Sequence, residues 1–282
     1  SPGIESFGAW LEQLVAESTG KNETGILPLH GEPLGGPEVY GKDRLFVYLR
    51  LDGEGQHDEQ ISELEKSGRC VVTLRLHSPY DLGREIFRWE FAVAVASSIL
   101  QVNAFDQPNV QEAKDITKQF LEIYQKEGKI PAGEQFAIDD LELEGALQGL
   151  LSAISPGKYL AFNVFLPPTN KNTAILEQVR KVVRDNLLIA TTVGFGPRYL
   201  HSTGQLHKGG TAKGLFVLVT AEDADDVPIP GQAYSFGTLK SAQALGDLEA
   251  LRKKGRRVVH IHLRSEEELE KLVDKFKSSF SK

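Results

Sequence analysis

The sequence has 282 residues, 40% of them hydrophobic, and its 32 Lys and Arg residues against 39 Asp and Glu residues leave a formal net charge of −7. This acidic balance argues against a nucleic-acid-binding protein, and the single cysteine, Cys70, excludes a disulfide framework. No apolar run approaches the roughly 20 residues that a membrane-spanning helix needs. We therefore expect a cytoplasmic protein of one or two domains, with neither nucleic acid nor membrane as a partner and with Cys70 as a small core residue.

Helices and strands alternate through the first 100 residues. Apolar side chains on one face predict a helix over residues 4–18, which ends before Gly20 as a C-cap glycine would have it. The other elements expected here are strands at 25–29, 45–51 and 70–76 and helices at 58–66 and 83–100. The last of these helices is apolar enough to be buried along much of its length. This order predicts a parallel sheet covered by helices.

A turn at residues 105–108 leads into an amphipathic helix predicted over 110–124. Gln107 and Lys114 are seven residues apart, about two helical turns, so both can face one spot at the helix start. An amide and an ammonium near a helix N-terminus suit a polyhydroxy, anionic ligand. An ordinary buried turn followed by a surface lysine explains the same spacing.

A Gly-rich and acidic stretch then indicates a linker or a solvated edge, after which the alternation restarts. Strands are expected at 159–166, 188–194, 215–221 and 257–263, and helices at 173–186, 239–254 and 266–280. A helix, a glycine and a strand recur in register around Gly68 and Gly255, which favours a duplicated unit. We divide the chain into a first domain at 1–130, a linker at 131–150 and a second α/β domain of similar design at 151–282.

Three short strings resemble phosphoglucose isomerases. FDQPNVQEAK at 105–114 resembles the FDQ-x-G-V-E-x-x-K signature of that family, in which the glutamine and the lysine line the sugar-phosphate site. Asn109 and Gln111 stand where the family usually has Gly and Glu. GEPLG at 31–35 is similar to the turn that carries the base glutamate of many members, and ESTGK at 17–21 resembles the family too. The resemblance implies that the first domain is a flavodoxin-like sugar-isomerase (SIS) domain, incomplete at its N-terminus.

Glu32 and His57 are the candidates for proton transfer. Glu32 is either a solvated loop acid or, at the end of a short strand, a carboxylate facing the crevice where parallel α/β folds bind ligands. His57 follows the strand at 45–51, and a lone loop histidine is usually a surface residue. The resemblance implies that Glu32 is the base and that His57 helps to open the sugar ring, with His77 as a nearby competitor.

The segment at 197–210, PRYLHSTGQLHKGG, places hydroxyls, histidines and a lysine among glycines. Such a segment suits phosphate binding, and a polar helix with a flexible glycine exit is the alternative. LHSTGQ resembles a segment beside the base in some short bacterial phosphoglucose isomerases. HSTGQLHKGG is similar to the C-terminal portion of bifunctional transaldolase/phosphoglucose isomerases, a likeness that extends over most of the chain. The substrate-binding residues expected on this basis are Gln107, His201, Ser202, Thr203, Gln205 and Lys208.

His260 and His262 alternate on a strand and therefore share one face. This spacing can ligate a metal ion, but a third ligand is not evident. A structural or surface role is favoured for both.

The resemblance implies that the chain interconverts glucose 6-phosphate and fructose 6-phosphate through a cis-enediol, with no metal or organic cofactor. His57 and Lys114 would open the ring, Glu32 would move the C2 proton, and Lys114 with Gln107 would steady the oxyanion. The partners implied are a second copy in a homodimer and upstream SIS and transaldolase domains of the same polypeptide. Without the upstream SIS domain we expect weak activity or none. A sugar-phosphate-binding module without chemistry and a structural dimerisation domain are the alternatives.

Overall fold

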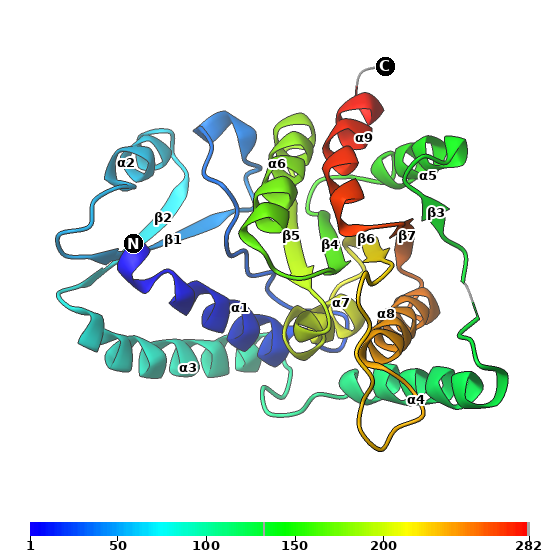
Figure 1. Cartoon of the computed structure of the whole chain (residues 1–282). Coiled ribbons are helices and arrows are strands. Elements are labelled where there is room, and N and C mark those ends of the chain that lie inside the picture. Colours follow the sequence, from blue (N-terminus) through cyan, green and yellow to red (C-terminus); the bar gives the residue numbers. More distant parts are fainter. Residues whose placement is uncertain (132, 281–282) are drawn as a thin grey trace.

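The computed structural model describes residues 1–131 and 133–280; residues 132, 281 and 282, which fall in the predicted linker and second domain, lie outside the described residues. The architecture is α/β with parallel sheets, which confirms the fold class predicted from the sequence. Within the described residues, one sheet has two strands and the other has five, and helices cover both faces of the larger sheet (Figure 1). In this described part of the chain, no helix combines the length and apolarity needed to cross a membrane.

The smaller sheet belongs to the first half of the chain. This half contains α1 (Ser6–Thr19), β1 (Leu45–Leu51), α2 (Asp58–Lys66), β2 (Cys70–Leu76), α3 (Leu82–Ile99) and α4 (Val110–Glu127). β1 and β2 pair in parallel along their whole length, from Leu45 opposite Cys70 to Leu51 opposite Leu76.

The strand predicted at 25–29 is wrong, because this segment is part of a loop that leads from α1 to β1. Side chains bind the backbone of the loop. The Arg180 guanidinium donates to the carbonyl oxygens of His30 and Gly31 at 3.3 and 2.7 Å, and the Thr19 hydroxyl accepts from the Ile26 amide at 3.1 Å. Backbone groups of this segment are therefore satisfied by side chains and not by hydrogen bonds to a neighbouring strand.

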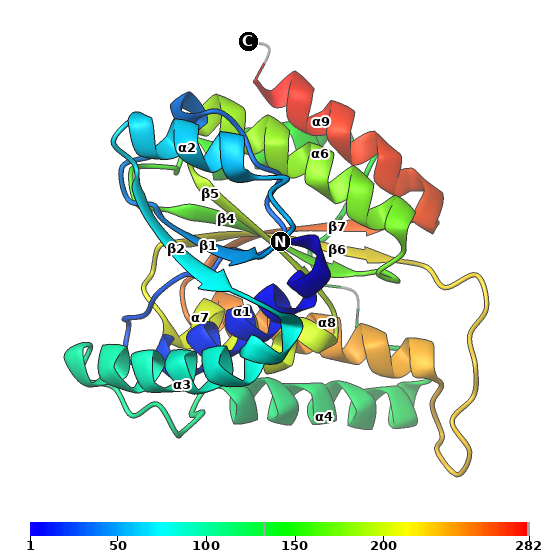
Figure 2. The ribbon, with the colours of Figure 1, turned by 90° about the vertical axis from the view of Figure 1, so that its left-hand side faces the viewer.

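The larger sheet belongs to the second half. Its elements are β3 (Phe136–Ala137), α5 (Leu141–Leu151), β4 (Tyr159–Phe165), α6 (Asn170–Leu187), β5 (Ala190–Phe195), α7 (Thr203–Gly209), β6 (Gly214–Ala221), α8 (Phe236–Lys253), β7 (Arg257–Leu263) and α9 (Lys271–Ser279). The strand order is β3-β7-β6-β4-β5, and all the strands are parallel. Helices α5, α6 and α9 cover one face, and α7 and α8 cover the other (Figures 1 and 2).

The main hydrophobic core lies between the larger sheet and helices α5, α6 and α9. Every residue of β4 and β6 is buried, as expected of central strands in a parallel sheet. Much of the segment predicted as a linker is helix α5, because Leu143, Leu147 and Leu150 recur at helical spacing and pack into this core.

The two halves pack against each other through two helix pairs, α1 with α7 and α4 with α8. The α4–α8 contact is close at Gly246, where an added Cβ would lie 3.2 Å from the carbonyl oxygen of Ala113. Ala113, Ile116 and Ala250 are buried between these helices. The FDQ turn, which precedes α4, is therefore held against the second half of the chain.

Two expectations about burial in the first half are wrong. Cys70 is exposed rather than part of the core. Helix α3 also presents large apolar side chains to solvent, with Phe87 71%, Phe91 63% and Ile99 77% exposed. Both results follow from the small size of this sheet, since a two-stranded sheet has few neighbours to cover its strands and its helix.

Candidate functional site

Three segments far apart in the sequence meet at one place, which we call the junction. They are the end of α1 with the two residues that follow it at 17–21, the turn at 103–109, and helix α7 with the residues just before it at 201–209. Figure 2 shows α1 and α7 side by side below the larger sheet. The junction contains the ESTGK string, the first half of the FDQPNVQEAK string and most of the LHSTGQ segment.

The Gln205 side chain connects all three segments. Its amide nitrogen donates to the carbonyl oxygen of Gly20 at 2.9 Å and to the side-chain oxygen of Asn109 at 3.0 Å. Its amide oxygen accepts from the Asn109 backbone nitrogen at 3.2 Å. Gln205 is 1% exposed. Gln205 was predicted to bind substrate. Because its polar atoms already have partners in the protein, it would contribute to substrate binding by positioning the turn.

Small residues allow this close approach. An added Cβ at Gly209 would lie 2.7 Å from both the carbonyl oxygen of Gly20 and the side-chain nitrogen of Gln205. An added Cβ at Gly20 would overlap the backbone of Leu206. The glycines of ESTGK and HKGG are therefore required by packing between α1 and α7.

Lys21 places a buried positive charge under the turn. The residue is 1% exposed, its ammonium donates to the carbonyl oxygen of Asn103, and it forms an ion pair with Asp106 at 3.2 Å. The side-chain oxygen of Asn103 in turn accepts from the Phe105 amide at 3.0 Å. The conformation of the turn is thus set by Lys21, a residue of the preceding helix region.

At the solvent-facing rim of the junction, the Gln107 amide donates to the carboxylate of Glu17. Gln13 donates to the other carboxylate oxygen at 3.3 Å. Glu17 is half-buried, and its partners are neutral amides. A carboxylate with this environment is open to a ligand.

Lys114 lies on the exposed side of α4. Across residues 1–131 and 133–280, its ammonium has no hydrogen bond or ion pair. Lys114, which was predicted to stabilise the oxyanion, is therefore available to a ligand. Gln107, its predicted partner, is bonded to Glu17 instead.

Glu32 is placed differently. One carboxylate oxygen accepts from the Thr191 hydroxyl at 3.0 Å and the Thr191 amide at 3.3 Å, and the other pairs with Arg44 at 3.1 Å. The side chains of Glu32 and Arg44 are each 9% exposed. Thr191 lies at the amino end of β5, whereas ligands of parallel sheets bind at the carboxyl ends. No hydrogen bond or ion pair within the described residues joins Glu32 to Gln107 or to Lys114.

His57 and His77 lie beside the smaller sheet. His57 precedes α2, with its Nδ1 atom 3.4 Å from the Gln60 side-chain oxygen. His77 follows β2 and has Nδ1 2.9 Å from an Asp52 carboxylate oxygen. In the part of the chain that the structure describes, neither histidine bonds to the junction.

The segment before and within α7 divides into an outer and an inner part. His201 is exposed, and Ser202, half-buried, donates to the carbonyl oxygen of Tyr199 at 3.3 Å. Thr203 is buried. The Lys208 side chain is 1% exposed and pairs with Asp247 at 2.6 Å. A phosphate could reach Lys208 only if this buried pair opened, so phosphate binding by Lys208 stays a prediction.

Glu17 and Lys21 are the junction residues to which the sequence reasoning assigned no role. The available signal was the likeness of ESTGK to phosphoglucose isomerases. Their contacts could not be predicted from the sequence, because Glu17 meets Gln107 across a separation of 90 residues and Lys21 meets Asn103 across 82.

Comparison with known proteins gives distant relatives, among them glucose-6-phosphate isomerases. The glucose-6-phosphate isomerase of Methanocaldococcus jannaschii is 26% identical over 149 residues, which cover 40% of this chain and 37% of that enzyme. The glucose-6-phosphate isomerases of Streptococcus pyogenes serotypes M18 and M5 are 28% identical over 153 residues, which cover 40% of this chain and 34% of theirs. The chain is thus a distant and partial relative of glucose-6-phosphate isomerases and spans about a third of the length of the curated relatives it matches.

No protein-family model matches the chain. Among solved structures, a hypothetical protein from Thermus thermophilus covers 97% of this chain and 74% of its own length, with a TM-score of 0.37 and 14% identity. A likeness at this level carries no argument about fold or function.

Proposed function

We propose that this chain carries part of the active site of an aldose–ketose isomerase that interconverts glucose 6-phosphate and fructose 6-phosphate. The observation that carries the proposal is the contact between Gln107 and Glu17 at the rim of the junction, with Lys21 buried beneath the turn. An accessible carboxylate, an amide and the exposed ammonium of Lys114 suit a polyhydroxy anion. The distant similarity to glucose-6-phosphate isomerases supports the same substrate.

The reaction needs a base that removes the proton from C2 of the open-chain aldose and returns it to C1 of the enediol. Glu17 and Glu32 compete for this role. Because Glu32 is bonded to a guanidinium and to Thr191, it would have to leave an ion pair before accepting a proton. Within residues 1–131 and 133–280, the hydrogen bonds of the Glu17 carboxylate come from amides alone, so the geometry favours Glu17.

The other roles follow from exposure. Gln107 orients the carboxylate of Glu17, and the free ammonium of Lys114 can stabilise the oxyanion that develops as the proton leaves. His201, exposed just before α7, competes with His57 for the ring-opening step. Ser202 and Thr203, at the start of α7, remain proposed contacts for the phosphate.

Exchange of the C2 proton of glucose 6-phosphate for solvent deuterium, followed by NMR, tests the proposal. We expect Glu17→Gln to reduce exchange by at least about a hundredfold, while binding of fructose 6-phosphate is kept. Glu23→Gln, which alters an exposed glutamate six residues away, is the matched control and should exchange at the parental rate. If Glu32→Gln abolishes exchange and Glu17→Gln does not, the base is Glu32.

Turnover of the isolated chain should be slow, since it spans a third of its relatives, so binding is measured first. A five-carbon aldonate phosphate, which mimics the enediolate, should bind more tightly than either sugar phosphate. Equal binding of all three without exchange in the intact polypeptide would favour a binding module without chemistry. The homodimer and the upstream SIS and transaldolase domains remain proposed partners, for which the exposed apolar faces of α3 and β2 offer room.

A further inference from the structure

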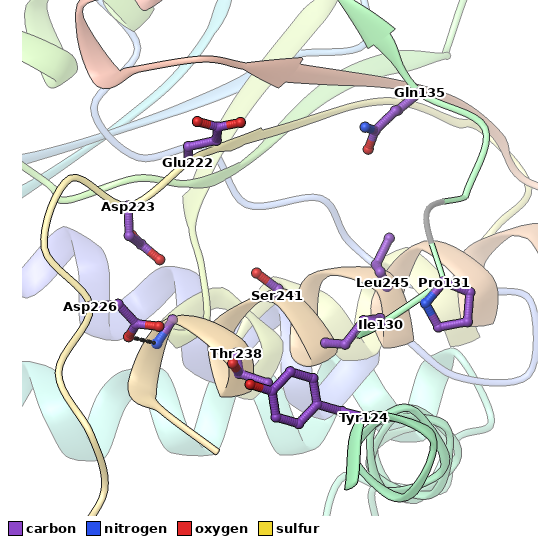
Figure 3. A pocket seen from close by; sticks show the side chains of 11 residues that line it. Tyr124, Ile130, Pro131, Gln135, Glu222, Asp223, Asp226, Thr238, Ser241 and Leu245 are labelled. Carbon is purple, nitrogen blue, oxygen red and sulfur yellow. Dashed lines mark hydrogen bonds between the residues drawn. The ribbon is translucent and has the colours of Figure 1, made fainter. Parts of the chain in front are cut away.

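A second cleft lies away from the junction, at the carboxyl ends of β6 and β7. Two cavities of about 400 and about 80 Å³ share Gln135, Ser241 and Leu245 in their walls and therefore adjoin each other. Figure 3 shows the larger cavity between the residues that follow β6, the start of α8 and Tyr124 of α4. We call this space the carboxyl-end cleft.

The position of this cleft is the one at which parallel α/β sheets bind ligands. The chain runs from β4 to β5 on one side and then returns to place β6 on the other side of β4, so the strand order reverses between β4 and β6. Phe165 at the end of β4 and Thr220 near the end of β6 both line the smaller cavity. The cleft therefore opens beside the topological switch point.

The inner end of the cleft contains a buried polar atom without a partner. His260 lines the smaller cavity and is 2% exposed. Its Nε2 atom lies 2.8 Å from the Thr220 hydroxyl, which also contacts His262 Nδ1 at 2.8 Å, whereas its Nδ1 atom has no hydrogen-bond partner among the described residues. Burial lowers the pKa of His260 to about 4, so the imidazole is neutral near pH 7. A neutral ring nitrogen at the inner end of a cleft can bind a hydroxyl group.

The outer end is rich in hydrogen-bond acceptors. Asp223 pairs with Lys240, and Asp226 accepts from the Gly237 amide at 2.7 Å. Glu222 has no side-chain hydrogen bond or ion pair within residues 1–131 and 133–280. Three carboxylates and one ammonium give this end a net charge of 1 − 3 = −2. A phosphate is disfavoured here, whereas hydroxyl donors are favoured.

The remaining walls of the carboxyl-end cleft combine apolar surface with hydroxyl groups, which suits the ring and the other hydroxyls of a sugar. Tyr124 and Leu245 offer apolar surface against which the C–H groups of a ring can pack, and the hydroxyls of Thr238 and Ser241 come from the first turns of α8 (Figure 3). A mixed wall of an aromatic ring, hydroxyls and carboxylates is typical of sites for small polar ligands. We propose that the carboxyl-end cleft binds an uncharged, non-phosphorylated polyhydroxy ligand of monosaccharide size.

This site differs from the junction in the ligand that it selects. The exposed ammonium of Lys114, on α4 beyond the FDQ turn, is available to a sugar phosphate, whereas the carboxyl-end cleft has a net negative charge. The two proposals are therefore separable, since the phosphate group should favour one site and oppose the other.

Saturation-transfer NMR with D-glucose and glucose 6-phosphate on the 282-residue chain tests the site. We expect transfer to glucose, which Glu222→Gln and Tyr124→Ala each weaken at least about tenfold, because the first replaces a charged acceptor in the wall of the cleft by a neutral amide and the second removes an aromatic wall. Asp225→Asn removes the same charge from the same loop without lining the cleft, and it should leave glucose binding unchanged. Glu17→Gln should also leave it unchanged.

A second readout reports on His260. Binding of glucose should shift the ¹⁵N resonances of its ring nitrogens, and an equal concentration of glucose 6-phosphate should shift them less. The proposal is overturned if glucose gives no transfer, if Glu222→Gln and Asp225→Asn behave alike, or if Glu17→Gln abolishes the signal. The last result would assign glucose to the junction. Failure of the isomerase proposal leaves these outcomes unaffected.

Discussion

The two parallel sheets are built from similarly apolar strands but differ in how they are covered. All eight residues of β6 are buried, whereas β1 buries only Tyr48 and Leu51, and Leu45 at its start is 61% exposed. β6 has a strand on each side and helices on both faces, but among the strands of the described residues β1 has only β2 beside it. The difference shows that an apolar run predicts a strand, while its neighbours decide whether the strand is buried.

The comparison also separates stability from function. The FDQ turn and α1 belong to the half with the smaller sheet, yet they are fixed by Gln205 of α7 and by the contact of α4 with α8. The candidate site of the less covered half therefore depends on the core of the other half. Substitutions in the two halves should differ in their effect on unfolding.

The largest effect should come from the buried charge pair beside α7. Asp247→Ala leaves the Lys208 ammonium buried without its carboxylate and removes the acceptor of the Tyr199 hydroxyl at 2.7 Å. We expect a loss of about 3 to 5 kcal/mol in the free energy of unfolding, measured in urea. Asp225→Ala, in an exposed loop, is the control and should change the free energy by less than about 0.5 kcal/mol. A loss below about 1 kcal/mol for Asp247→Ala would show that the pair is replaced by water.

A matched pair of valines compares the sheets directly. Val217 of β6 is 0% exposed, and Val72 of β2 is 42% exposed. Val217→Ala should lower the free energy of unfolding by about 2 to 3 kcal/mol, and Val72→Ala by less than about 0.5 kcal/mol. Equal losses would mean that the exposed face of the smaller sheet is covered in solution, for example by a second copy of the chain.

Local features of the fold were predictable from the sequence. The helix–glycine–strand pattern around Gly68 and Gly255 is present at both places, with φ angles of 79° and 67°. In each case the next amide, of Arg69 or Arg256, bonds back to the helix at 3.0 Å. Only glycine adopts this conformation without strain, so a short string was sufficient to predict it.

Features that depend on distant partners were not predictable. The acidic residues around the start of α5 led to the prediction of a solvent-exposed linker. The leucines of α5 that pack into the core can be identified as core residues only once the position of the larger sheet is known. The burial of Lys208 depends on Asp247, which is 39 residues away. The base favoured by geometry was missed for the same reason, since the accessibility of Glu17 and the pairing of Glu32 are set by residues outside their strings.

The pH dependence of stability distinguishes the halves again, first through His207 of α7. Its ring is surrounded by Tyr159, Tyr199 and Phe216, and burial lowers its pKa to about 3. Below pH 6.5, His207 binds a proton in the unfolded chain but stays neutral in the folded chain. The free energy of unfolding therefore falls as the pH falls. Between pH 6.5 and 4.5 this loss amounts to about 2 to 3 kcal/mol. In His207→Leu that loss should disappear from urea unfolding measured at the two pH values, and an unchanged pH slope would contradict the assignment.

Glu12 of α1 should act in the opposite sense in the first half. Burial raises its pKa to about 7, against an opposing effect of Arg180. The folded chain holds a proton that the unfolded chain releases above pH 4.5, so this contribution is present below pH 4.5 and is lost as the pH rises through 7. Because the side chain is only half-buried, we expect about 1 to 2 kcal/mol. Glu12→Gln should therefore make the rise in stability between pH 4.5 and 7 steeper, whereas Glu23→Gln, at an exposed position, should leave it as it is. If Glu12→Gln flattens the rise instead, Glu12 is ionised in the folded chain and is stabilised by the nearby arginines rather than destabilised by burial.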